Sequence, residues 1–194
     1  MSTSTAVRDT PALTLDPAQL KSQLWADPAQ RVHAVLMGSR LPGLMERLHG
    51  ELAANELEDF DCLVPGALSA AQQAEAPYLV RLRAGTAFTD WLLFEACPSL
   101  GDWGVLATSA VHMTALRSHL RALREARLPN GSIITLDWMD PAVMRLLLPL
   151  FDASALTAFM GPVISWVIPG NGQWTLVRAA MGRLEQRDVR YQKA

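Results

Sequence analysis

The chain has 194 residues, of which half are apolar and 19% are charged, and its formal net charge is −2. This composition is typical of a single globular domain that could comprise two lobes, and it excludes a disordered or fibrous protein. Because no excess of positive charge attracts phosphates or anionic lipids, and no apolar run is long enough to cross a bilayer, we expect neither a nucleic-acid nor a membrane partner.

The first residues lack the features of a targeting signal. Residues 1–14 are poor in apolar anchors, so we interpret them as a flexible tail ahead of a main domain over 15–178. Without the apolar core of a secretory signal, the protein is expected to be cytoplasmic. Cys62 and Cys97 are too few for a disulfide framework and share no metal-type spacing, so we expect two reduced, buried thiols.

Helices and strands are predicted to alternate through the first half of the chain. The dipeptide Asp16-Pro17 predicts a helix start, because the carboxylate can accept from free amides of the first turn and proline has no amide hydrogen to leave unpaired. The apolar run from Arg31 to Met37 predicts a central strand that is buried on both faces. The further elements expected here are a helix over 44–52, an acidic loop over 56–61, a strand over 60–64, a helix over 68–74, a strand over 78–83, a helix over 86–96 and a strand over 103–108.

An amphipathic helix followed by a turn and a strand is predicted after His112. The apolar stripe of this helix consists of Leu116, Leu120 and Leu123. Pro129 is expected to end the helix, Asn130-Gly131 to form a turn that tolerates positive φ, and residues 132–138 to form a strand.

Two helices and a strand are predicted to follow. Asp140-Pro141 repeats the helix-start signal, and the next helix is capped by Asp152 or Ser154 and ends at Gly161-Pro162. The buried face of the first of these helices is expected to consist of Val143, Leu146, Leu147 and Leu150. The elements together predict an α/β fold in which helices pack around a central mixed β-sheet.

The end of the chain is predicted to contain a hairpin. A turn over 169–172 joins strands over 163–168 and 173–177, so Trp166 and Trp174 could face one another across the two strands. Residues 179–194 form a polar C-terminal segment that the sequence assigns neither to a helix nor to a loose tail.

Groups capable of catalysis do not cluster in the sequence. Asp137 and Asp140 are the best carboxylate pair for acid–base chemistry, although Asp140 already has a capping role. His112 and His119 are two helical turns and roughly 10 Å apart, too far to share one metal ion. We therefore expect no enzymatic activity, no cofactor and no metal site, and keep an enzyme that uses Asp137 as an alternative.

A stripe of arginines is the best candidate for a binding surface. Arg117, Arg121 and Arg124 lie on one side of the predicted helix, away from its leucines. Such a stripe forms either a solvated helix face or a patch that receives an acidic partner.

Several short blocks, in this order, resemble the signature blocks of one family. The blocks are Ala76–Leu82 (APYLVRL), Trp103-Gly104, His119–Gly131 (HLRALREARLPNG), Asp140-Pro141 followed by Leu146–Pro149 (LLLP), and Phe159–Pro162 (FMGP). They resemble the type VI secretion effector adaptors, also called Tap or TEC proteins, a domain-of-unknown-function family, and the resemblance covers roughly residues 31–169. One block departs from the family pattern, because the chain has Asp137-Trp138-Met139 where members often carry Arg-Phe-Tyr.

The resemblance implies a cytosolic adaptor that binds a cognate toxic effector, keeps it soluble and loads it onto a VgrG-type spike protein. It implies that the segments around Trp138 and Phe159 form the framework of a partner-binding region, with the arginines as rim contacts. The residues expected at this region are Arg117, Arg121, Arg124, Trp138, Asp140 and Phe159. The alternative is an immunity-type protein that binds and neutralises a toxin.

Overall fold

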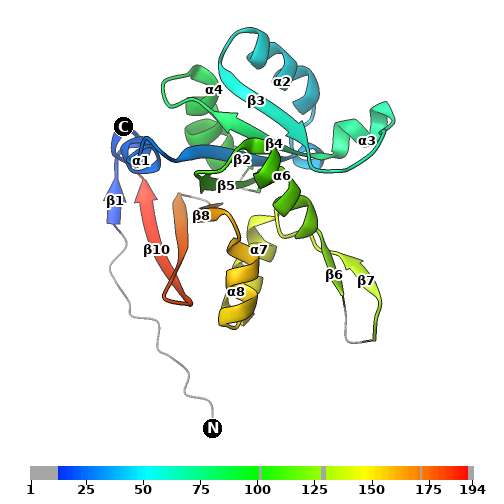
Figure 1. Ribbon diagram of the computed structural model, residues 1–194. Helices are drawn as coiled ribbons and strands as arrows, with labels where there is room; N and C mark the ends of the chain where they lie inside the picture. Colours follow the sequence, from blue (N-terminus) through cyan, green and yellow to red (C-terminus); the bar gives the residue numbers. More distant parts are fainter. Residues whose placement is uncertain (1–12, 101, 128–129, 171, 192–194) are drawn as a thin grey trace.

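An eight-stranded sheet runs through the centre of the structure, and helices pack on both of its faces (Figure 1). The computed structural model describes residues 13–100, 102–127, 130–170 and 172–191. The strand order is β1-β10-β9-β8-β5-β2-β4-β3, and neighbouring strands are antiparallel except for the parallel pair of β1 and β10. The predicted α/β class with a mixed sheet is confirmed.

The strands and helices have the following bounds. The central sheet consists of β1 Leu13–Leu15, β2 Arg31–Met37, β3 Leu57–Cys62, β4 Pro77–Leu82, β5 Gly104–Ser109, β8 Val163–Gly170, β9 Gln173–Ala180 and β10 Arg183–Tyr191, and a separate hairpin consists of β6 Glu125–Arg127 and β7 Ile133–Thr135. The helices are α1 Pro17–Leu24, η1 Gly38–Arg40, α2 Leu44–Ala53, α3 Ala70–Glu75, α4 Ala87–Asp90, the π-helical η2 Trp91–Ala96, α5 Cys97–Leu100, α6 Met113–Ala122, α7 Pro141–Leu147, η3 Leu148–Leu150 and α8 Ala153–Met160.

Each face of the sheet has its own hydrophobic core, because successive residues of a strand point to opposite faces. Ala34 and Leu36 of β2 belong to the core that contains residues of α1 and α2, whereas Val35 belongs to the core that contains residues of α6, α7 and α8. Figure 1 shows α2 and α4 on one side of the sheet and α7 and α8 on the other. The five inner residues of β2 are all buried, which confirms the prediction of a strand covered on both faces.

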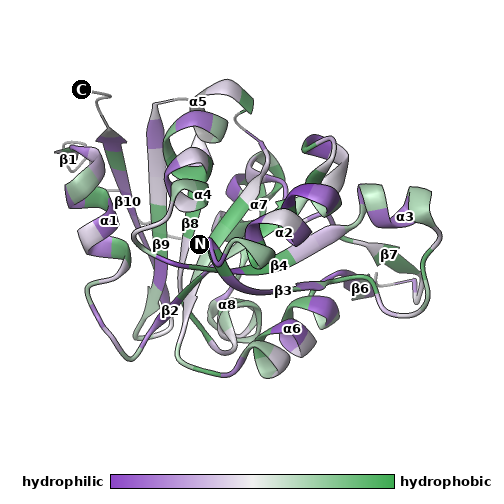
Figure 2. Cartoon of the chain, turned by 90° about the horizontal axis from the view of Figure 1, so that it is seen from above, coloured by the Kyte–Doolittle hydropathy of each residue, from purple (hydrophilic) through white to green (hydrophobic). Residues whose placement is uncertain are grey.

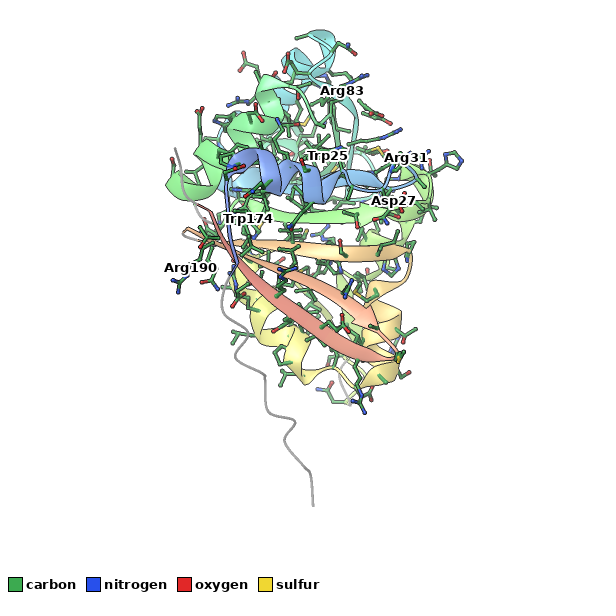
Figure 3. The ribbon with its side chains drawn as sticks, turned by 90° about the vertical axis from the view of Figure 1, so that its left-hand side faces the viewer. Trp25, Asp27, Arg31, Arg83, Trp174 and Arg190 are labelled. Carbon is green, nitrogen blue, oxygen red and sulfur yellow. The ribbon has the colours of Figure 1, made fainter. Side chains whose placement is uncertain are left out.

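The predicted contact between Trp166 and Trp174 is wrong. The register of β8 and β9 pairs Trp166 with Val177 and Trp174 with Pro169. Because residues 166 and 169 of one strand are an odd number of positions apart, the two indoles point to opposite faces of the sheet. Each is fully buried in a different core, and Figure 3 shows α1 lying across the sheet on the side of Trp174.

The predicted helix starts at Asp16 and Asp152 and the predicted stop at Gly161 are present. Asp16 forms a capping box with Gln19, in which the Gln19 amide donates to the Asp16 carboxylate at 2.8 Å. Asp152 caps α8, because its carboxylate accepts from the Ala155 amide at 2.7 Å. Gly161 ends α8 with a φ of +47°, and a Cβ atom there would collide with the imidazole of His119.

The buried stripe of α7 matches the predicted one only in part, because Leu147 is partly buried against the core. Leu146 and Leu150 are 73% and 78% exposed, whereas Pro141, Met144 and Leu148 are buried. Apolar residues occupy two adjacent stripes of this helix, and the sheet contacts the stripe that contains Met144. The helix therefore exposes two large apolar side chains.

Three further predicted elements differ from the structure in their type or in where they end. The acidic segment expected to be a loop forms β3, an edge strand of the central sheet. The helix after His112 ends at Ala122 rather than near Pro129, because residues 125–127 pair with β7. The helix expected over 86–96 changes from α-helical to π-helical hydrogen bonding at Trp91.

The central sheet extends beyond both predicted ends of the main domain. β10 belongs to the segment 179–194, and it pairs with β9 on one side and with β1 on the other. Leu13 and Thr14 lie in β1, so the part of the predicted tail that the structure describes is paired; the remainder of that tail, residues 1–12, lies outside the described residues. Within the described ranges, none of the helices has the length and apolar character needed to cross a bilayer.

Candidate functional site

The arginine stripe of α6 is engaged within the molecule. The Arg117 guanidinium forms an ion pair with the Asp61 carboxylate of β3. Arg121 donates to the carbonyl oxygen of Cys62 at 2.6 Å and lies 3.9 Å from the same carboxylate. These contacts join α6 to the acidic edge strand, so Arg117 and Arg121 are already paired within the chain. That they form rim contacts with a partner stays a prediction.

Arg124 differs from the other two arginines. Its side chain is half-buried and has no carboxylate within ion-pairing distance among the described residues. Its carbonyl oxygen accepts from the Leu136 amide at 2.7 Å, which closes the base of the β6–β7 hairpin. Arg124 therefore lies where the hairpin leaves the body of the protein.

Trp138 and Phe159 lie in an aromatic cluster inside the protein. Trp138 is fully buried and Phe159 is 4% exposed. The ring centroids of Trp138 and Trp166 are 5.2 Å apart, and those of Trp138 and Phe159 are 6.2 Å apart at nearly a right angle. Such edge-to-face packing fixes α8 and the segment before α7 against the sheet. Both side chains are buried and contribute packing to the core, and their part in a partner-binding region stays a prediction.

Asp140 has the capping role that the sequence predicts. Its carboxylate accepts from the amides of Ala142 at 2.8 Å and Val143 at 3.4 Å, at the start of α7. The Arg40 guanidinium lies 3.5 Å from the same carboxylate and 3.2 Å from that of Asp102. Asp140 thus stabilises the junction between η1, α7 and the segment before β5 rather than presenting a free charge to a partner.

Asp137, the candidate acid–base residue, is exposed. In the part of the chain that the structure describes, its carboxylate has no hydrogen-bond or ion-pair partner. Its backbone carbonyl accepts from the Asp140 amide at 3.1 Å, whereas the Asp140 carboxylate is engaged in capping. Of the two carboxylates, that of Asp140 is engaged in capping and that of Asp137 is exposed to solvent. Nowhere in the described ranges do three or more His, Cys, Asp or Glu side chains come close enough together to hold a metal ion.

Two histidines lie inside the protein with different surroundings. His33 of β2 is fully buried, and neither ring nitrogen has a hydrogen-bond partner among the described residues. Burial, assisted by the nearby Arg81 guanidinium, lowers the pKa of His33 to about 4, so its imidazole is neutral at physiological pH. His119 places Nε2 3.0 Å from the carbonyl oxygen of Phe159 and links α6 to α8.

Cys62 is a free thiol that is half-buried. Its sulfur accepts from the Val64 amide at 3.3 Å. The side chain of Cys97 lies outside the described part of the structure.

A hollow of about 890 Å³ lies between α1 and the segment from Ala84 to Glu95. Trp25 and Phe94 are among its lining residues, and Lys21 pairs with Asp90 across it at 2.6 Å. The hollow is open to solvent, and the charges of Lys21 and Asp90 neutralise each other.

The structure exposes large apolar side chains in two places near the predicted site. Ile133 and Ile134 of β7 are 58% and 39% exposed, and Leu146 and Leu150 lie on the outer side of α7 and η3. Figure 1 shows the hairpin projecting from the body, and β7 has the hydrophobic colour in Figure 2. The sequence signal for the hairpin was the Asn130-Gly131 turn, but the turn does not reveal that the following strand lies outside the central sheet.

Comparison with known proteins gives one match. The family described as a domain of unknown function (DUF4123) matches residues 32–158, well over half of the chain. No curated protein and no solved structure is significantly similar to the chain. The matched segment begins in β2 and ends in α8, so it contains the aromatic cluster residue Trp138, the α6–β3 contact and the β6–β7 hairpin.

Proposed function

The chain belongs to the DUF4123 family, and from this premise we propose that it is a cytosolic adaptor that binds a cognate effector of a type VI secretion system. In this function it keeps the effector soluble and delivers it to the VgrG-type spike. The family membership over residues 32–158 carries the proposal, because the blocks that resemble the effector adaptors lie almost entirely within this segment.

The surface supports a role in protein binding. The two cores bury most of the large apolar side chains, yet β7 directs the side chains of two isoleucines into solvent. Exposed apolar side chains grouped on one element are typical of surfaces that a partner covers.

The test is co-expression with the effector encoded by a neighbouring gene. We expect the full-length chain to raise the soluble yield of the effector and to co-purify with it as a defined complex. Deletion of the gene that encodes the chain should abolish export of that effector, and expression of the same gene from a plasmid should restore export. A soluble effector that is exported normally without the chain would contradict the proposal, and neutralisation of the toxin without any effect on export would identify an immunity protein.

The same purified complex tests the enzyme alternative. The enzyme alternative would hold if the chain turned over a substrate and Asp137→Asn abolished that turnover. If capture of the effector persisted in this variant, the protein would be both an enzyme and an adaptor. We expect Asp137→Asn to leave both capture and export unchanged, because the carboxylate has no described partner.

A further inference from the structure

The β6–β7 hairpin combines exposed apolar side chains with a strand that has one open edge. Among the described residues, β7 pairs with β6 alone, in a two-stranded sheet separate from the central one. Ile133 and Ile134 are successive residues of β7 and therefore point to opposite faces of the hairpin. Both are exposed, as is Thr135. An isolated pair of strands gains little stability from such side chains, so a covering surface is needed to explain them.

The backbone of β7 has hydrogen-bonding groups along its outer edge. The Leu136 amide donates to the Arg124 carbonyl oxygen, which identifies these residues as a hydrogen-bonded pair at the base of the hairpin. Bonded and non-bonded pairs alternate along an antiparallel ladder, so Ile134 bonds inward to β6. The N–H and C=O groups of Ile133 and Thr135 point outward, and no residue in the described ranges occupies them.

The corresponding edge of the central sheet is protected by charge. β3 ends that sheet and contains Glu58, Asp59 and Asp61 within six residues. Charged side chains on an edge strand discourage the addition of another strand, because the added strand would desolvate them. Residues 132–135 have the sequence Ser-Ile-Ile-Thr and contain neither a charge nor a proline. Of these two edges, β7 is the one suited to receive a strand.

We propose that β7 binds an extended segment of the effector as the third strand of this hairpin. The proposal rests on the adaptor function above and specifies the partner's binding element. The segment must have apolar residues at successive positions, because Ile133 and Ile134 cover opposite faces of the added strand. It must also be uncharged where it lies against residues 132–135.

A second copy of the chain is a poorer occupant than the effector. Two three-residue strands that pair with each other bury far less than the roughly 1,200 Å² found in stable interfaces. A segment that belongs to an effector already held by other contacts has a high effective concentration, so a short added strand is sufficient.

The experiment compares the affinity of three full-length proteins for the intact effector that the chain captures. The test variant is Ile133→Thr combined with Ile134→Thr, which keeps β-branched side chains and therefore the strand propensity. The matched control is Leu146→Gln combined with Leu150→Gln, which removes exposed apolar side chains from the α7–η3 segment instead. We expect the isoleucine variant to lose at least about tenfold in affinity and the control to lose less than about threefold.

Circular dichroism and denaturant unfolding establish that both variants are folded. Equal binding by the isoleucine variant and the wild-type chain would overturn the inference and leave the adaptor function intact. A wild-type chain that captures no effector would instead contradict the adaptor function. Sedimentation is expected to show a monomer, and a wild-type dimer that the isoleucine substitutions dissociate would assign β7 to a second copy and overturn the inference.

Discussion

The α6–β3 contact and the β6–β7 hairpin both contain side chains suited to a partner, but only those of the α6–β3 contact are already paired within the chain. The α6–β3 contact contains the arginines of the predicted binding stripe, and Asp61 and the Cys62 carbonyl of the same chain already occupy two of them. The β6–β7 hairpin contains isoleucines whose side chains and outer backbone edge meet solvent.

The difference shows that charge at a surface is a weak sign of a binding site when a counter-charge lies elsewhere in the chain. An ion pair between partly exposed side chains changes stability little, and a partner that uses either group must compete with the internal pair. Exposed apolar side chains on a strand edge have no charge that another part of the chain could neutralise. Only burial removes them from water. The following predictions test this comparison, from the largest effect to the smallest.

Trp138 is fully buried in the aromatic cluster of the core, so Trp138→Ala is expected to have the largest effect. The substitution leaves a cavity beside Trp166 and Phe159 and should lower the free energy of unfolding by about 3–5 kcal/mol. Denaturant unfolding measures this loss, with Leu146→Ala as the exposed control at about 0.5 kcal/mol or less. A similar small loss for both variants would show that Trp138 is not part of a packed framework.

The stability of the protein should decrease in acid because of His33, which lies in β2 of the central sheet. Folded His33 has a pKa of about 4, whereas an unfolded histidine has a pKa near 6.5, so the unfolded state binds more protons between these values. Stability is therefore fully present above about pH 6.5 and falls toward pH 4, by up to about 3 kcal/mol. The variant His33→Gln cannot titrate, and the difference between its unfolding curves and those of the wild-type chain across this range isolates the effect. Identical pH dependence of the two proteins would contradict the buried, neutral histidine.

The ion pair between α6 and β3 should contribute modestly to stability and not to binding. Arg117→Glu places two carboxylates together and should cost about 1 kcal/mol, with a smaller cost at high salt. Adding Asp61→Lys restores opposite charges and should recover part of the loss. Unfolding in low and high salt measures both changes. If Arg117→Glu abolished effector capture without lowering stability, the arginine stripe would be part of the binding interface and the comparison between the two regions would be wrong.

The hairpin isoleucines should contribute least to folding. Ile133→Thr combined with Ile134→Thr is expected to change the free energy of unfolding by no more than about 0.5 kcal/mol, because both side chains are exposed in the free protein. Denaturant unfolding of the variant measures the change. A loss above about 2 kcal/mol would mean that these side chains stabilise the isolated chain and are not reserved for a partner.

Local signals in the sequence were sufficient for the features that local chemistry determines. Asp16, Asp140 and Asp152 cap helices where the sequence predicts caps, because each carboxylate bonds amides only two or three residues away. The apolar residues at both alternating sets of positions in β2 predicted burial on both faces for a similar reason, since this pattern needs no knowledge of neighbouring strands.

Features that depend on distant residues were not predictable in the same way. Asp61 is 56 residues from Arg117, and no periodicity reveals that the two side chains meet. α7 has apolar residues on adjacent stripes, and only the position of the sheet selects Met144 over Leu146. β10 was missed because it inserts just Leu184 and Val189 toward the cores, and its remaining described side chains are polar or charged.

The comparison between the two regions is tested most directly by amide hydrogen exchange of the full-length chain, measured alone and in complex with its effector. The account predicts that the complex slows exchange at the outward amides of Ile133 and Thr135, which would bond to an added strand, while exchange in β3 stays unchanged. Protection confined to α6 and β3, with the hairpin exchanging as fast as in the free chain, would contradict it.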